Sequence, residues 1–156
     1  MKDPAESNSV RSAFYAVFAH LFAAPPDAGF YDRLRAGGFG RLAAAQGLDL
    51  TSDLVDEADA ESCAAELHAE YDRLFGAVAL TASSYRAGTG DPAVAVAAFL
   101  REHRLQLEVG GDLPADHLSV ALGVMGALAA EAEAAPRRRD GAAARTAARR
   151  SRAFLA

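Results

Sequence analysis

The sequence is poor in the residues that build β-sheets and disulfide frameworks. Its 156 residues include no tryptophan, no isoleucine, one lysine and one cysteine, and aromatic residues make up 8%. The single cysteine, Cys63, excludes an intramolecular disulfide, so the chain gains nothing from an oxidising compartment. Isoleucine and the aromatic residues are enriched in strands, and their scarcity argues against a sheet-based fold.

Long hydrophobic runs are also missing. No stretch approaches the roughly 20 apolar residues that a membrane-spanning helix needs. The first residues, MKDPAE, are polar and lack the apolar core of a secretory signal. We therefore expect a soluble, cytoplasmic protein with no stable insertion into a membrane.

Alanine, in contrast, is abundant. It occupies 39 positions, and hydrophobic residues make up 51% of the chain. Alanine is the best helix former, and a chain of this length fits one domain. We predict an all-α fold, an irregular helical bundle that forms a single domain over residues 10–156 after a flexible N-terminal leader of residues 1–9.

Helical spacing and capping signals place the predicted helices. The first apolar stripe consists of Phe14, Val17, Phe18, Leu21 and Phe22. Further helices are expected to start at Asp27, near Leu42, at residues 53–57, at Asp91-Pro92, at residues 114–116 and after Pro136. The expected stops are Pro25-Pro26, Gly37-Gly38, Gly47, Gly76 and Gly110-Gly111.

Charge is spread unevenly along the chain. The formal net charge is −5, but residues 137–152 contain seven arginines and one aspartate, which leaves −11 for the rest. Residues 49–72 contain nine acidic residues and neither lysine nor arginine. An acidic body repels nucleic acid and attracts basic ligands, although a solvated helix face accounts for the same charges.

The residues that could support catalysis form no recognised pattern. The histidines, at positions 20, 68, 103 and 117, occur in no His-Glu-x-x-His or Cys/His spacing typical of a metal site. A Gly-x-Ser-x-Gly elbow is also missing. We therefore expect neither enzymatic activity nor a bound metal or cofactor.

Three segments, taken in order, carry a family resemblance. The first comprises RSAFY at residues 11–15 and FAHLFAAPPD at 18–27, the second EYDRLF at 70–75 and SSY at 83–85, and the third LPADHLSV at 113–120. Together they resemble the TorD/DmsD/NarJ family of redox-enzyme maturation chaperones over roughly residues 10–155. The resemblance implies an all-helical chaperone for the catalytic subunit of a molybdenum oxidoreductase. Such a chaperone binds the subunit's twin-arginine leader and holds the apoenzyme until the molybdenum cofactor is inserted and export begins.

The resemblance also implies a set of peptide-binding residues. Asp116 and His117 match the family's Asp-His pair, Glu70 matches the glutamate of its Glu-Tyr pair, and Tyr85 matches a loop tyrosine. Alternatives stay open at each position: Asp116 as a helix cap, His117 as a satisfied histidine, Tyr85 as a loop anchor. Tyr71, Phe18 and Phe22 are better explained as core residues. Some relatives bind guanine nucleotides weakly, but these residues give no independent sign of it.

The chain departs from the family pattern at several positions. The family's Pro-Tyr-Glu-Ser stretch is here replaced by residues 80–84. After the Asp-His pair, Ala121 stands where the family has an acidic residue, and Val124 stands where it has an aromatic residue. Family chains usually continue beyond Leu155, which implies missing C-terminal helices, helices supplied otherwise, or a partly open core. An open apolar face favours a homodimer formed by helix exchange.

A second function class uses the arginine-rich segment at residues 137–152. Such a segment can contact phosphates, as in a nucleic-acid-binding helical regulator. The acidic body and the lack of helix-turn-helix spacing argue against it, so we expect no nucleic-acid partner.

Overall fold

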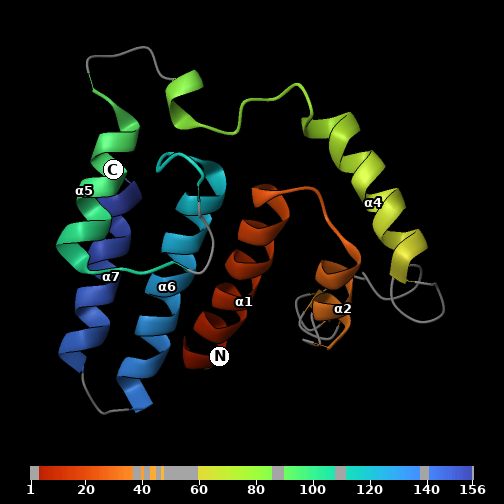
Figure 1. The fold of residues 1–156 in the computed structure, drawn as a ribbon. Helices are drawn as coiled ribbons and strands as arrows, with labels where there is room; N and C mark the ends of the chain where they lie inside the picture. The colour runs from red at the N-terminus through yellow and green to blue at the C-terminus, as the bar shows by residue number, and fades with distance from the viewer. Residues whose placement is uncertain are drawn as a thin grey trace. The chain divides into compact units, whose positions relative to one another are not determined.

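The computed structural model describes residues 4–36, 40, 43–44, 47, 60–85, 90–107, 112–137 and 141–155. These residues contain six α-helices, one 3₁₀-helix and no strand, which confirms the all-α prediction. In chain order the helices are α1 (Pro4–Ala23), α2 (Ala28–Ala36), α4 (Ala60–Phe75), η1 (Ala82–Ser84, 3₁₀), α5 (Pro92–His103), α6 (Leu118–Arg137) and α7 (Gly141–Leu155) (Figure 1).

The chain divides into two compact units. Unit 1 consists of Met1–Ala23 and Leu80–Ala156, and unit 2 of Ala24–Ala79. Unit 1 therefore contains α1, η1, α5, α6 and α7, and unit 2 contains α2 and α4. That residues 10–156 form one domain stays a prediction.

Helix α1 begins inside the segment predicted to be a flexible leader. Its first residue is Pro4, so residues 4–9 belong to the helix. Proline at the first helical position causes no loss of a backbone hydrogen bond, because the N–H groups of the first turn have no acceptor within the helix. That residues 1–9 form a flexible leader stays a prediction.

Helix α6 is the centre of unit 1. It packs against α1 on one side and α7 on the other (Figure 1). Val124 and Leu128 of α6 are fully buried, and Ala147 of α7 is nearly so. Phe154 of α7 contacts Phe99 of α5 with ring centroids 5.0 Å apart, so α5 is joined to the group through α7.

The α1–α6 interface uses small residues. A Cβ added at Gly126 would lie 3.4 Å from the Tyr15 Cβ and 3.7 Å from the Ser12 carbonyl oxygen. The Ser12 hydroxyl donates a hydrogen bond to the Gly126 carbonyl over 3.1 Å, and Ala19 is fully buried. Glycine at position 126 thus allows the two backbones to approach closely.

The aromatic stripe of α1 follows a different face. Phe14, Phe18 and Phe22 stack along the helix with successive ring centroids 6.3 Å apart. Phe18 is 39% exposed, so the prediction that it is a core residue is wrong. The reason is that α6 packs against the face of α1 that carries the smaller side chains. Sequence periodicity identifies the most apolar face of a helix, and here that face is not the one that packs against α6.

In unit 2, Asp27 caps α2 as predicted. Its Oδ1 accepts the Phe30 N–H over 2.6 Å, and Phe30 and Tyr31 are buried. Helix α2 packs against α4, whose Cys63 and Ala64 are buried. The predicted helix starts near Leu42 and at residues 53–57 lie outside the described residues. Gly47 has a φ of 80° and donates to the Ala44 carbonyl, a geometry typical of a helix end.

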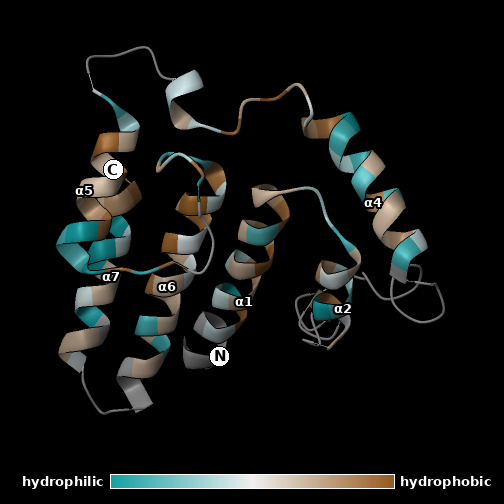
Figure 2. Ribbon diagram, in the orientation of Figure 1, coloured by the Kyte–Doolittle hydropathy of each residue, from teal (hydrophilic) through white to brown (hydrophobic). Residues whose placement is uncertain are grey.

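Helix α5 also begins at its predicted cap. The Asp91 carboxylate accepts the Ala93 N–H over 2.9 Å, and Pro92 is the first helical residue. Hydrophobic and hydrophilic residues are interspersed along the helices (Figure 2), as expected of helices that pack on one side and face solvent on the other. Within the described ranges, no helix is both long and apolar enough to cross a membrane.

Candidate functional site

The segment before α5 lies against the beginning of α6. The Leu118 N–H donates to the Leu80 carbonyl over 2.7 Å, and the Ala82 N–H donates to the Asp116 carbonyl over 3.1 Å. Thr81 and His117 form an isolated antiparallel bridge. We call residues 80–85 and 116–119 the junction. Because residues 114–117 form its turn, α6 starts at Leu118 rather than at the predicted residues 114–116.

Asp116 ties the two halves of the junction together. Its side chain is buried, with 6% exposure, and Oδ2 accepts the Ser83 N–H over 2.8 Å. Thr81, at the N-cap position of η1, makes no side-chain capping bond, so Asp116 supplies the cap from 33 residues away. The hydrogen bond from the Ser83 backbone lowers the pKa of Asp116, against the effect of burial.

His117 lies at the N-cap position of α6. Its Nδ1 accepts the Ser119 N–H over 3.2 Å and lies 3.1 Å from the buried Ser119 hydroxyl. Burial lowers the pKa of His117, while the neighbouring Asp116 charge raises it. A ring nitrogen that accepts a backbone N–H is unprotonated, so the neutral imidazole carries its proton on Nε2. His117 therefore caps α6, and the alternative that Asp116 caps this helix is wrong.

Tyr85 follows η1 directly and is displayed to solvent. Its N–H donates to the Ala82 carbonyl, which closes the 3₁₀ turn, and the residue is 71% exposed. The side chain is therefore not anchored in the core. The junction thus combines a buried carboxylate, a neutral imidazole and an exposed phenol within unit 1.

Glu70 belongs to the other unit. It lies on the exposed face of α4 and forms an ion pair with Arg73, whose Nε donates to Oε2 over 2.7 Å. The hydrogen bond from Arg73 lowers the pKa of Glu70. The structure therefore brings Asp116, His117 and Tyr85 together in unit 1 and places Glu70 in unit 2.

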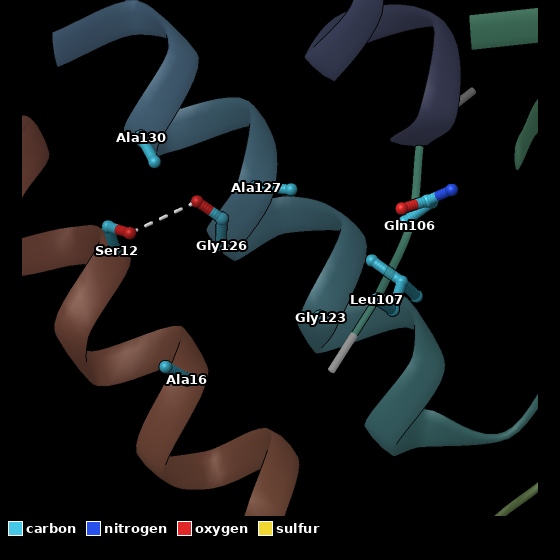
Figure 3. A pocket seen from close by; sticks show the side chains of 8 residues that line it. All are labelled: Ser12, Ala16, Gln106, Leu107, Gly123, Gly126, Ala127 and Ala130. Carbon is cyan, nitrogen blue, oxygen red and sulfur yellow. Dashed lines mark hydrogen bonds between the residues drawn. The ribbon is translucent and has the colours of Figure 1, made fainter. Parts of the chain in front are cut away.

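A cavity of about 290 Å³ is lined by α1, by α6 and by residues 106–107, which follow α5 (Figure 3). It is lined mainly by small side chains and by one leucine: Ser12, Ala16, Gln106, Leu107, Gly123, Gly126, Ala127 and Ala130. Gly123 is six residues beyond His117, which corresponds to about 9 Å along the helix axis. Sequence reasoning did not find these residues; the signal was the glycines and alanines at helical spacing on α6.

The side chains that bind metals are dispersed. Among the described residues, no group of three or more histidine, cysteine, aspartate or glutamate side chains is arranged to hold a metal ion. Cys63 is a free, buried thiol on α4.

Comparison of the sequence with protein families gave a match. The family described as nitrate reductase delta subunit matches residues 40–156, about three quarters of the chain. The chain belongs to the nitrate reductase delta subunit family. Members of this family are maturation chaperones for molybdoenzymes rather than catalytic subunits, so the resemblance found in the sequence is confirmed. Comparisons with curated proteins and with solved structures gave no match.

The match to the nitrate reductase delta subunit family includes the whole junction. Glu70, Tyr85, Asp116 and His117 all lie within the matched residues 40–156. Helix α1 lies before them, so Ser12 and Ala16 contribute to the cavity from outside the matched segment.

Proposed function

We propose that this chain is a cytoplasmic chaperone that binds the N-terminal twin-arginine leader of a molybdopterin-dependent oxidoreductase catalytic subunit. It holds the apo form of that subunit during cofactor insertion and before export. The junction is the observation that carries the proposal. It places the ionised Asp116, the neutral His117 and the exposed Tyr85 at one end of α6.

The charges at the junction suit a cationic ligand. The lowered pKa of Asp116 keeps its carboxylate charged at neutral pH, although the group is buried. A guanidinium group is attracted by this charge and also stacks on the face of a tyrosine ring such as Tyr85. The Nε2–H of His117 remains for a backbone carbonyl of the peptide. In this proposal Asp116 acts mainly by positioning Ser83–Tyr85 and by its field.

The apolar part of a leader needs a different surface. In our proposal, its side chains lie along α6 from the junction into the cavity lined by α1, α6 and residues 106–107. Leu107 and the alanines of the cavity wall provide apolar contacts. An open cavity of this kind favours moderate affinity, which release of the client requires.

Calorimetric titration with leader peptides tests the proposal. The ligands are twin-arginine leaders of molybdoenzymes from the same genome, each paired with a version in which both arginines are replaced by glutamine. We expect binding of the arginine form, and about tenfold weaker binding by Tyr85→Ala, because an exposed aromatic side chain at an interface is a typical binding hot spot.

Val94→Ala is a matched control, because Val94 is 62% exposed in the same unit but lies on α5. It should bind like the wild type. If the wild type bound neither form of the leader, or bound the glutamine form equally well, the proposed function would be wrong. Glu70→Gln, with Glu66→Gln as its control on the same helix, tests whether α4 contributes.

Membership of the nitrate reductase delta subunit family favours the chaperone over the nucleic-acid-binding regulator considered from the sequence.

A further inference from the structure

One face of α7 carries arginines and no acidic residue. Arg145, Arg149 and Arg152 are spaced by four and three residues, which places them on one side of the helix. All three are exposed. Ala147 and Phe154 lie on the opposite side, where they are buried or contact α5. We call Arg145, Arg149 and Arg152 the arginine face.

The remaining arginine of α7, Arg150, lies on a different side of the helix. Arg150 points toward α6 and forms an ion pair with Glu131 over 3.1 Å. Within the part of the chain that the structure describes, no carboxylate pairs with Arg145, Arg149 or Arg152. The helix thus uses one arginine for internal packing and presents three to solvent.

We propose that the arginine face binds an acidic helical segment of the client subunit, outside its leader. This inference rests on the proposed function. Carboxylates spaced by three or four residues on a partner helix repeat at the same interval as the three guanidinium groups. Guanidinium groups pair with carboxylates in bidentate geometry. The exposed Ala148 and Ala153 beside the arginines are small enough for a second helix to approach.

Other anionic partners fit this surface less well. A helix that binds a membrane surface carries bulky apolar residues beside its cations, whereas the neighbours of these arginines are mainly alanines, with Leu155 at the end. Nucleic acid is repelled by the remainder of the chain, whose formal charge is −11 outside residues 137–152. An acidic protein segment meets the arginine face locally and needs no contact with the acidic remainder.

The two sites then have opposite tasks. The junction attracts the basic leader, and the arginine face attracts an acidic part of the same client. Simultaneous engagement raises the overall affinity above that of either site alone. Release of the leader for export would therefore not by itself release the client from the chaperone.

The test uses the full chain and leaderless apo forms of the molybdoenzyme catalytic subunits of the same genome. We expect the wild type to bind at least one of them at low salt, with affinity falling as salt is raised. The variant R145Q/R149Q/R152Q should bind that subunit about tenfold more weakly. Its binding of the leader peptide should equal that of the wild type.

The control variant R11Q/R101Q/R104Q removes three exposed arginines from α1 and the end of α5. It changes the net charge equally and should retain the binding of the leaderless subunit. Circular dichroism checks that both variants keep their helix content. The inference is overturned if no leaderless subunit binds, or if both variants weaken binding to the same extent. It is also overturned if the arginine face instead binds a 20-base-pair DNA duplex or phosphatidylserine vesicles more tightly than the subunit. If the leader does not bind but the leaderless subunit does, the proposed leader-binding function is wrong and binding at the arginine face is not.

Discussion

Asp116 and His117 are neighbours whose pKa values are both lowered, for different physical reasons. For Asp116 the main cause is the hydrogen bond from the Ser83 backbone, which stabilises the charged form. For His117 it is burial, which destabilises the charged form. At neutral pH the pair therefore consists of one anion and one neutral ring, and each contributes to stability in its own pH range.

Replacement of Asp116 by asparagine should reduce stability in a pH-dependent manner. Because the native pKa lies below the ordinary value of 3.8, ionised Asp116 stabilises the fold above about pH 4. That contribution is lost as the pH falls through the native pKa. We expect Asp116→Asn to lower the free energy of unfolding by about 1–2 kcal/mol at pH 7, and by less at pH 3. Urea unfolding at both pH values measures this. An equal loss at both would contradict the role of the charge.

Replacement of His117 by asparagine should remove a pH dependence instead. The native pKa of His117 lies below 6.5, so its neutral form stabilises the fold above that pH, and the contribution is lost as the pH falls through the native value. Asparagine also caps helices but does not titrate. We expect the variant to match the wild type within about 1 kcal/mol at pH 7.5 and to lose less stability at pH 5. Thermal melts at both pH values measure this. If the stability of the wild type and of the variant fell equally between pH 7.5 and pH 5, the prediction would be wrong.

At the scale of elements, the approach of α1 to α6 depends on Gly126. The added Cβ of alanine would meet Tyr15 at 3.4 Å, which is close to an ordinary contact. A larger side chain has no room there unless α1 moves. The small residues of this interface therefore determine both how closely the helices pack and the shape of the cavity beside them.

Gly126→Leu should separate α1 from α6. We expect a loss of about 1–3 kcal/mol in the free energy of unfolding, because overpacking displaces backbone. Gly126→Ala should stay within about 1 kcal/mol of the wild type, since better helix propensity offsets the closer contact. Ala130→Leu is the control and should be tolerated, because Ala130 lies on the same helix but is exposed and lines the open cavity. A tolerated Gly126→Leu in urea unfolding would show that the interface is loose.

At the scale of the whole molecule, α6 of unit 1 and α4 of unit 2 differ in how many side chains they bury. Fully buried Val124, Leu128 and Ser119 all belong to α6, whereas α4 in unit 2 buries Cys63 and Ala64 and exposes Leu74 by 45%. Regions with few buried side chains open locally at a lower free energy than the core. Helices α4 and α6 are therefore expected to differ in local stability.

Hydrogen exchange would detect that difference. Amides in the middle of α6, around Leu128, should exchange only through global unfolding, so their rates should follow the urea-unfolding free energy. Amides in α4 should exchange through local opening, at least tenfold faster. Equal protection of α4 and α6 would mean that the chain unfolds as one cooperative unit.

Local signals in the sequence predicted local structure well. Asp27 and Asp91 cap their helices as expected, because an aspartate cap bonds to an N–H only two or three residues away. Long-range contacts were harder to predict. The role of Asp116 depends on Ser83, 33 residues away, and the exposure of Phe18 depends on which face of α1 meets Gly126.

The all-helical fold and the charge asymmetry follow from the sequence by itself, because helix propensity and charge belong to individual residues. The family resemblance was also carried by short segments of sequence. Only the tertiary structure decided that His117 rather than Asp116 caps α6, that Asp116 holds η1, and that Arg145, Arg149 and Arg152 share an exposed face opposite the packed side of α7. Burial and hydrogen bonding between distant segments set these roles, and neither belongs to a residue until the chain has folded.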